Sequence, residues 1–138
     1  MDRFLRIMEN NDLAFENDLA TKVIGFAMEV HTQLEPGLLE NAYKQGLAFK
    51  LRNEGLSIEV EKRMPLIIDG VELENGYCID ILVERKLVLE LKAVERTTDI
   101  HFAQTLNYLK LDKFKLGLLI NFNVPRLKLG IRRVINTK

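Results

Sequence analysis

The sequence contains 138 residues, of which 47% are apolar and 29% are charged, and its 20 basic side chains balance its 20 acidic ones. These values are typical of one globular domain and exclude intrinsically disordered, collagen-like and low-complexity proteins. No apolar run approaches the roughly 20 residues of a membrane-spanning helix, and the N-terminal residues lack the apolar core of a signal peptide. The single cysteine, Cys78, excludes an internal disulfide and a four-cysteine metal site. We therefore expect a cytoplasmic protein with no membrane partner.

The charge is distributed unevenly along the chain. Residues 1–109 carry 12 basic and 19 acidic side chains, whereas residues 110–138 carry 8 basic side chains and a single acidic one, that of Asp112. A basic segment beside an acidic body can bind a polyanion while the acids hold a metal ion. A solvated basic surface explains the same asymmetry.

The chain shows no repeat, linker or change of composition that would mark a second domain. Residues 1–16, rich in Asn and Asp, are predicted to form a loosely ordered lead-in, and residues 17–138 a single domain.

Two helices are predicted at the start of this domain. Apolar residues at helical spacing indicate the first over residues 17–34, with Asn17 or Asp18 placed to cap it. The Glu35-Pro36-Gly37 segment ends this helix. The second is predicted from Leu38 to about Asn53, since Gly55 is a natural helix terminator.

The apolar period then changes to two, which is typical of β-strands. Later in the chain, Asp99 is predicted to cap a third helix that runs to about Leu111. The order is therefore two helices, four strand segments, a helix and two strands, which predicts an α/β fold with helices packed against a mixed sheet. The strand segments are expected at residues 57–62, 64–68, 77–84, 87–94, 116–122 and 131–135.

Two acidic residues and a lysine fall on the third and fourth of these segments. Because side chains alternate along a strand, Glu90 and Lys92 point to the same face of the sheet. If the two strands form a hairpin centred on Arg85, Asp80 lies opposite Glu90, with Cβ atoms about 4.5–5.5 Å apart. Two carboxylates this close repel each other unless a cation lies between them. The pattern therefore predicts a divalent cation with oxygen ligands. A solvated strand face with one ion pair explains the same three residues.

The same residues carry a resemblance to a known family. Asp80, followed by Glu90-Leu91-Lys92, resembles the D…(D/E)xK core of the PD-(D/E)XK nuclease superfamily. The segment from Gly37 to Tyr43 is similar to the GxxExxY signature of a family of small bacterial and archaeal proteins. The resemblance covers roughly residues 17–135 and implies a restriction-endonuclease-like core, with a mixed sheet flanked by helices. Glu35 departs from the pattern, because the family usually has glycine there.

The resemblance implies a catalytic role for five residues. Asp80, Glu90 and Glu40 are implied as ligands of Mg²⁺, for which Mn²⁺ can substitute. Lys92 is implied to orient or activate the attacking water and to stabilise the charge that develops on the phosphate. Gln104 is implied to support the site or to contact the substrate.

Further candidates lie on the predicted helices and in the basic C-terminal segment. Residues three or four apart on a helix share a face, so Tyr108 lies beside Gln104 and Tyr43 beside Glu40. Structural roles are open for all of these positions: core packing for the tyrosines, a buried hydrogen-bonded histidine and a solvated edge for the arginines. The candidates for substrate binding are Tyr43, Tyr108, His31, Arg132 and Arg133.

The sequence thus predicts a Mg²⁺-dependent nuclease that hydrolyses phosphodiester bonds of nucleic acid, DNA in preference to RNA. A homodimer is also considered, because so small a domain often needs a second copy to grip a duplex. The alternative is a non-catalytic nucleic-acid- or protein-binding module on the same fold. A metal-dependent hydrolase of another phosphoester would use the same ligands.

Overall fold

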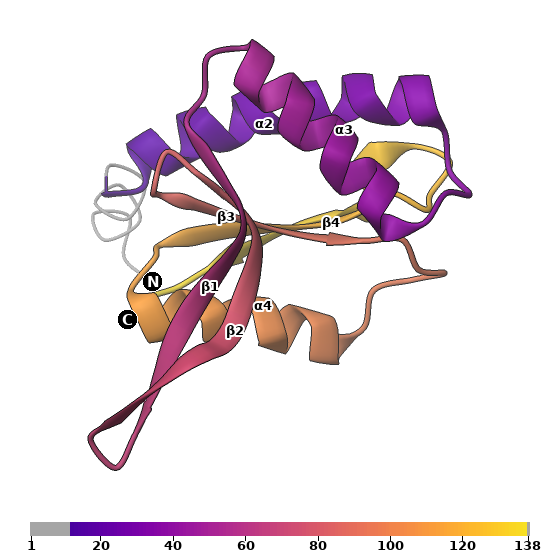
Figure 1. Cartoon of the computed structure of the whole chain (residues 1–138). Coiled ribbons are helices and arrows are strands. Elements are labelled where there is room, and N and C mark those ends of the chain that lie inside the picture. The colour runs from indigo at the N-terminus through magenta and orange to yellow at the C-terminus, as the bar shows by residue number, and fades with distance from the viewer. Residues whose placement is uncertain (1–11, 138) are drawn as a thin grey trace, which may run out of the picture.

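The computed structural model describes residues 12–137, in which a five-stranded sheet lies between two helical layers (Figure 1). Helices α2 and α3 cover one face of the sheet, and helix α4 covers the other. None of these helices combines the length and the apolar character needed to cross a membrane. The elements are α2 (Ala14–Leu34), α3 (Glu40–Asn53), β1 (Ile58–Ile68), β2 (Val71–Val83), β3 (Leu87–Lys92), α4 (Asp99–Asp112), β4 (Leu116–Asn121), the 3₁₀ helix η1 (Leu127–Gly130) and β5 (Ile131–Ile135).

The sheet has the strand order β1-β2-β3-β4-β5, and it is mixed, as predicted. The β3–β4 pair is parallel and is connected through α4, whereas the other three pairs are antiparallel. The first two predicted strand segments join into the single strand β1. Its pairing with β2 shifts between Met64 and Leu66, where Pro65 has no N–H to donate to the sheet.

The two central strands are buried on both faces, which explains their almost continuous apolar sequences. Every residue of β4, and every residue of β3 except Lys92, is buried. Because side chains alternate along a strand, Leu89 and its alternate neighbours pack against α2 and α3. Val88 and Leu119 pack against α4. The apolar side chains thus hold both helical layers on one sheet.

The helix starts differ from the predicted ones. Helix α2 begins at Ala14 without a side-chain cap, so the prediction that Asn17 or Asp18 caps it is wrong. Residues 14–16 of the predicted lead-in are helical because the buried Leu13 and Glu16 hold this turn to the body; residues 1–11 of the lead-in lie outside the described part of the chain.

The capping prediction for α4 is also wrong by one residue. Thr98, not Asp99, caps this helix, and its hydroxyl accepts a hydrogen bond from the His101 backbone N–H at 3.3 Å. The His101 ring in turn accepts one from the Thr98 backbone N–H at 3.1 Å. Histidine thus takes the place that Glu or Gln usually has in a reciprocal cap.

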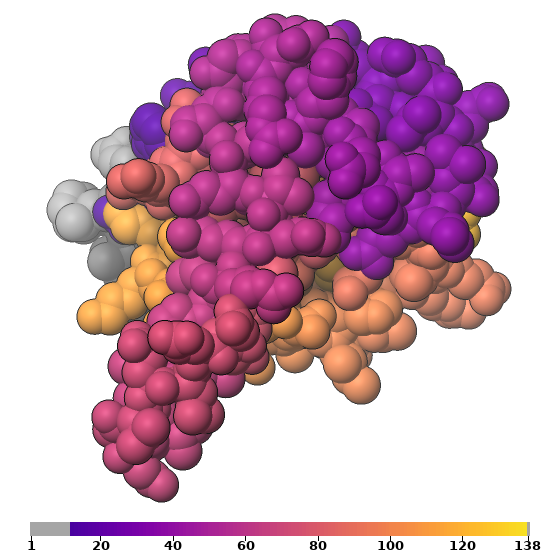
Figure 2. Space-filling model, in the orientation of Figure 1, coloured from indigo at the N-terminus to yellow at the C-terminus, as the bar shows by residue number. Residues whose placement is uncertain are grey.

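The distal halves of β1 and β2 form an arm that projects from the body (Figures 1 and 2). The register pairs Leu66 with Leu73 and Ile68 with Val71, so the two pairs share one face of the arm. Ile68, Val71 and Leu73 are largely exposed. The arm therefore adds little to the core, and the site described below lies nearer the middle of the sheet.

The loop between α2 and α3 is held by one buried tyrosine. The Tyr43 hydroxyl donates a hydrogen bond to the Glu35 carbonyl at 2.6 Å and accepts one from the Leu38 N–H at 3.0 Å. Glu35 itself has φ 59° and ψ 168°, a combination that is found essentially in glycine. This backbone geometry would suit glycine better than glutamate.

Replacing Glu35 by glycine is therefore expected to stabilise the protein by about 1 kcal/mol, because relief of backbone strain outweighs the greater flexibility of glycine in the unfolded chain. Urea denaturation measures this change directly. Glu54→Gly is the matched control, since Glu54 has an ordinary φ of −87°. An equal increase in the free energy of unfolding in both variants would contradict backbone strain at Glu35.

Candidate functional site

Asp80 and Glu90 interlock across the β2–β3 pair. The hairpin has the predicted register, with Ile81 opposite Leu89, which sets Asp80 beside Glu90. At this point the two side chains, in place of backbone carbonyls, accept the hydrogen bonds between the strands. The Asp80 N–H donates to Glu90 Oε2 at 2.9 Å, and the Leu91 N–H donates to Asp80 Oδ2 at 2.8 Å. Each carboxylate is thus fixed by the backbone of the opposite strand.

Helix α3 adds a lysine that the sequence analysis did not select. Lys44 Nζ lies 3.5 Å from Asp80 Oδ1 and 3.2 Å from Glu61 Oε1. Glu61 lies on β1 between the partners of Ile81 and Ile79, and therefore opposite Asp80. The signal was available, because Lys44 follows Glu40 by four residues and so shares its helical face.

The pKa values indicate that these groups form one electrostatic unit. Burial and the neighbouring Asp80 charge raise the pKa of Glu90 to about 8, although Lys92 opposes the rise. Burial and the charge of Asp80 also raise the pKa of Glu40, while Lys92 and Lys44 lower it. Glu40 on α3 therefore lies within electrostatic reach of the acids on β2 and β3. We call Glu40, Glu61, Asp80 and Glu90 the carboxylate cluster.

The donors of this cluster suit a divalent cation. Carboxylate oxygens are the ligands that Mg²⁺ prefers, and each of Asp80 and Glu90 uses one oxygen for a backbone N–H, which leaves a second oxygen for other partners. Burial and the neighbouring Asp80 charge raise the pKa of Glu90, and a bound cation would favour its ionised form. Within residues 12–137, no three acidic, histidine or cysteine side chains are already gathered around a common point as metal ligands. The fit therefore rests on donor chemistry.

Helix α4, on the other face of the sheet, brings Tyr108 within electrostatic reach of Glu90, with Gln104 beside it. Burial and the charge of Glu90 raise the pKa of Tyr108, whereas a hydrogen bond with Gln104 lowers it. The Tyr108 ring stacks on Tyr77 with centroids 4.6 Å apart. Gln104 is exposed beside Tyr108. Tyr108 is therefore placed near Glu90, and Gln104 contacts Tyr108.

The structure gives two other predicted substrate-binding residues places in the core. Tyr43 is fully buried, its ring stacks on Phe122 at 4.7 Å, and its hydroxyl is used by the loop before α3. His31 is buried as well, and its Nε2 lies 2.7 Å from the Val124 carbonyl. Packing and local hydrogen bonds account for the positions of both side chains. His31 also lines a shallow pocket with Arg126 and Lys128.

Arg132 and Arg133 are not brought together. They are consecutive on β5, so they point to opposite faces of the sheet. The Arg132 guanidinium lies 4.5 Å from the centre of the Phe102 ring on α4, whereas Arg133 donates to the Asn17 side chain on α2. A single phosphate cannot contact both arginines in this arrangement.

Asn121 is a buried polar residue at the end of β4, next to Lys92 in the sheet register. Its side chain donates to the Val94 carbonyl at 2.9 Å and accepts from the Val94 N–H at 3.1 Å. The Asn121 side chain thus pairs with the Val94 backbone as a further strand residue would, and it holds the chain just after Lys92. Asn121 is therefore a positioning residue that the sequence pattern did not reveal.

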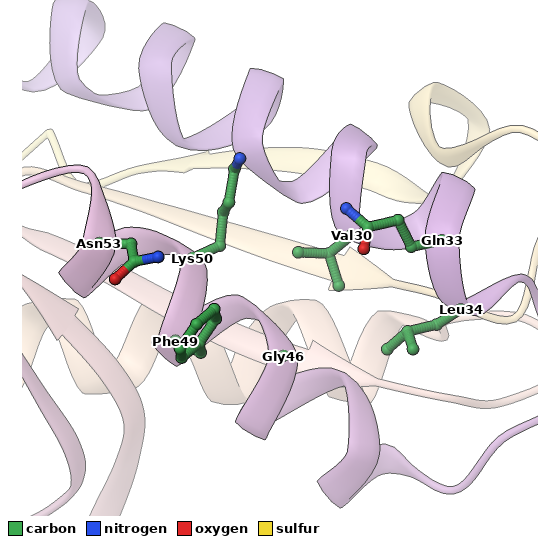
Figure 3. A pocket seen from close by; sticks show the side chains of 7 residues that line it. All are labelled: Val30, Gln33, Leu34, Gly46, Phe49, Lys50 and Asn53. Atoms are coloured by element: carbon green, nitrogen blue, oxygen red, sulfur yellow. The ribbon is translucent and has the colours of Figure 1, made fainter.

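A separate groove lies between α2 and α3 (Figure 3). Lys50 and Phe49 point into it from α3, and Val30 and Leu34 line it from α2. None of its lining residues belongs to the carboxylate cluster, and none carries a carboxylate or an imidazole. The groove is thus distinct from the site on the sheet.

The comparisons with known proteins identify the superfamily and support the fold. A family model described as the PD-(D/E)XK nuclease superfamily matches residues 17–134, and the chain belongs to this superfamily. A solved structure, "Crystal structure of SSO0001", is similar with a TM-score of 0.55 and 20% identity. The match covers 70% of this chain and 50% of that one. Because the identity is only 20%, the match supports the fold alone. No curated protein matches the sequence.

The raised pKa of Glu90 predicts how the metal-free protein responds to pH. Between its ordinary value of 4.5 and about 8, the folded protein keeps a proton that the unfolded chain has lost. This contribution to stability is present at low pH and disappears as the pH rises through 8. In EDTA, wild type is expected to lose about 3 kcal/mol more than Glu90→Gln between pH 5.5 and 8.5.

Urea denaturation at both pH values measures this difference. Glu54→Gln, at the exposed end of α3, is the control and is expected to keep the wild-type pH dependence. An equal change in the free energy of unfolding between the two pH values in wild type and Glu90→Gln would contradict the raised pKa of Glu90.

Proposed function

We propose that this protein is a divalent-metal-dependent nuclease that hydrolyses phosphodiester bonds of nucleic acid, with DNA as the preferred substrate. The observation that supports it is the interlocked pair of Asp80 and Glu90, which resembles the D…(D/E)xK core of the superfamily to which the chain belongs. Lys92, two residues after Glu90 on β3, completes that pattern.

Each residue of the site has a distinct task in this proposal. Asp80, Glu90 and Glu40 would hold Mg²⁺, or Mn²⁺ in its place. The ion, when bound, would supply Lewis-acid polarisation of a phosphoryl oxygen and neutralise the charge that develops there. Lys92 offers an ammonium group that can orient the attacking water and bind a phosphate oxygen. Gln104 and Tyr108 border the cluster from α4, where they can contact the substrate.

Hydrolysis of labelled single- and double-stranded DNA and RNA, with Mg²⁺ or Mn²⁺, tests this proposal. Asp80→Ala is expected to abolish turnover because it removes a ligand. Lys92→Ala is expected to lower turnover about 100-fold or more, in line with the loss of one stabilising donor. Activity that survives both changes would point to a contaminating enzyme.

Asp69→Ala and Lys86→Ala are matched controls for these variants. Asp69 lies at the tip of the arm and Lys86 in the exposed turn before β3, and both are away from the site. Each is expected to retain wild-type activity.

Metal binding can also be measured without turnover. Mg²⁺ at ten times its Kd is expected to stabilise wild type by about 1.4 kcal/mol, because it binds the folded chain alone. Thermal unfolding with and without Mg²⁺ shows this as a higher Tm for wild type and Asp69→Ala. Asp80→Ala is expected to show no rise, and an equal rise in that variant would place the ion elsewhere.

A non-catalytic binding module is the second candidate. It is favoured by the pairing of Asp80 with Lys44, which partly neutralises the site without any metal. This candidate predicts that nucleic acid binds without being cut and that Glu90→Gln leaves its affinity unchanged.

A homodimer and a cytoplasmic location also stay predictions, which analytical ultracentrifugation and cell fractionation would test.

A further inference from the structure

Lys44 is the one buried lysine within residues 12–137, and no buried arginine accompanies it there. Burying an ammonium group is costly unless carboxylates compensate for the lost hydration. The structure provides this compensation from two strands, through Asp80 on β2 and Glu61 on β1. Lys44 is therefore held beside Asp80 by the charges of the site itself.

The Lys44 ammonium lies between two carboxylate oxygens, as a bound cation would. Its distances of 3.5 Å to Asp80 Oδ1 and 3.2 Å to Glu61 Oε1 make it a bridge between the strands. Asp80 Oδ2 accepts the Leu91 N–H instead. The two oxygens of Asp80 therefore face different partners. Oδ1, on the side of Glu61, already has a cationic partner in Lys44.

The charge balance around Asp80 leaves room for one divalent ion. Four carboxylates form the cluster, and two ammonium groups, those of Lys44 and Lys92, act on it. Metal ligands bind in their ionised form, so the six groups then carry two negative charges in excess. One divalent cation balances this charge, whereas a second would give the six groups and the two ions a net positive charge.

We propose that Lys44 takes the place of a second divalent cation, so that the cluster binds a single divalent cation through Asp80, Glu90 and Glu40. This inference rests on the proposed metal dependence and adds the number of ions to it. Lys44 acts as a positioning residue that keeps Asp80 and Glu61 together without metal.

Isothermal titration with Mn²⁺ alone tests the proposal without any measurement of turnover. Wild type is expected to bind one Mn²⁺ per chain. Lys44→Met keeps the apolar stem but removes the charge, and it is expected to bind two. The double variant Lys44→Met/Glu61→Gln removes a ligand of the new position and is expected to return to one.

Two controls separate this role from general effects on folding or charge. Lys44→Arg retains a positive charge and is expected to bind one Mn²⁺. Lys50→Met removes another α3 lysine, which pairs with Glu29 and Glu54 away from the site, and is also expected to bind one. Thermal unfolding of each variant confirms that the protein titrated is folded.

The outcomes distinguish this inference from the proposed function. Two Mn²⁺ ions in wild type, or one ion in a folded Lys44→Met variant, would overturn the role of Lys44 while leaving a metal-dependent nuclease intact. Absence of Mn²⁺ binding in wild type would overturn both.

Discussion

The site depends on two reciprocal hydrogen bonds between neighbouring strands. A carboxylate from β2 accepts a backbone N–H of β3, and a carboxylate from β3 accepts one of β2. Bonds between a charged acceptor and a backbone donor are stronger than neutral ones, so the two acids stay close despite their mutual repulsion. The sheet thereby holds two acids closer together than two ionised free side chains would settle.

The same arrangement has an energetic cost within the protein. Glu90 is almost completely buried and its pKa is raised to about 8, so its ionised form is disfavoured in the absence of a cation. Groups that are held in unfavourable electrostatic surroundings are typical of functional sites. The rest of the fold offsets this cost, since β3 and β4 are otherwise almost entirely apolar and packed on both faces.

Helix α3 links the core to the carboxylate cluster. Its Tyr43 packs on Phe122 and holds the preceding loop, and both contacts set the position of the helix relative to the sheet. Glu40 and Lys44 lie one turn apart on that helix. Glu40 lies within electrostatic reach of Asp80 and Glu90, and Lys44 pairs with Asp80. Tyr43 therefore has a structural task, while Glu40, three residues before it, lies within electrostatic reach of Asp80.

The sequence by itself determined the α/β class, the mixed sheet and the opposition of Asp80 and Glu90. These follow from local rules: apolar periodicity, strand alternation and a short hairpin whose length sets its register. It could not place Lys44 beside Asp80, bury Tyr43 and His31, or separate Arg132 from Arg133. Those outcomes depend on how helices pack on particular faces of the sheet, and residues distant in the chain meet only after that packing is complete.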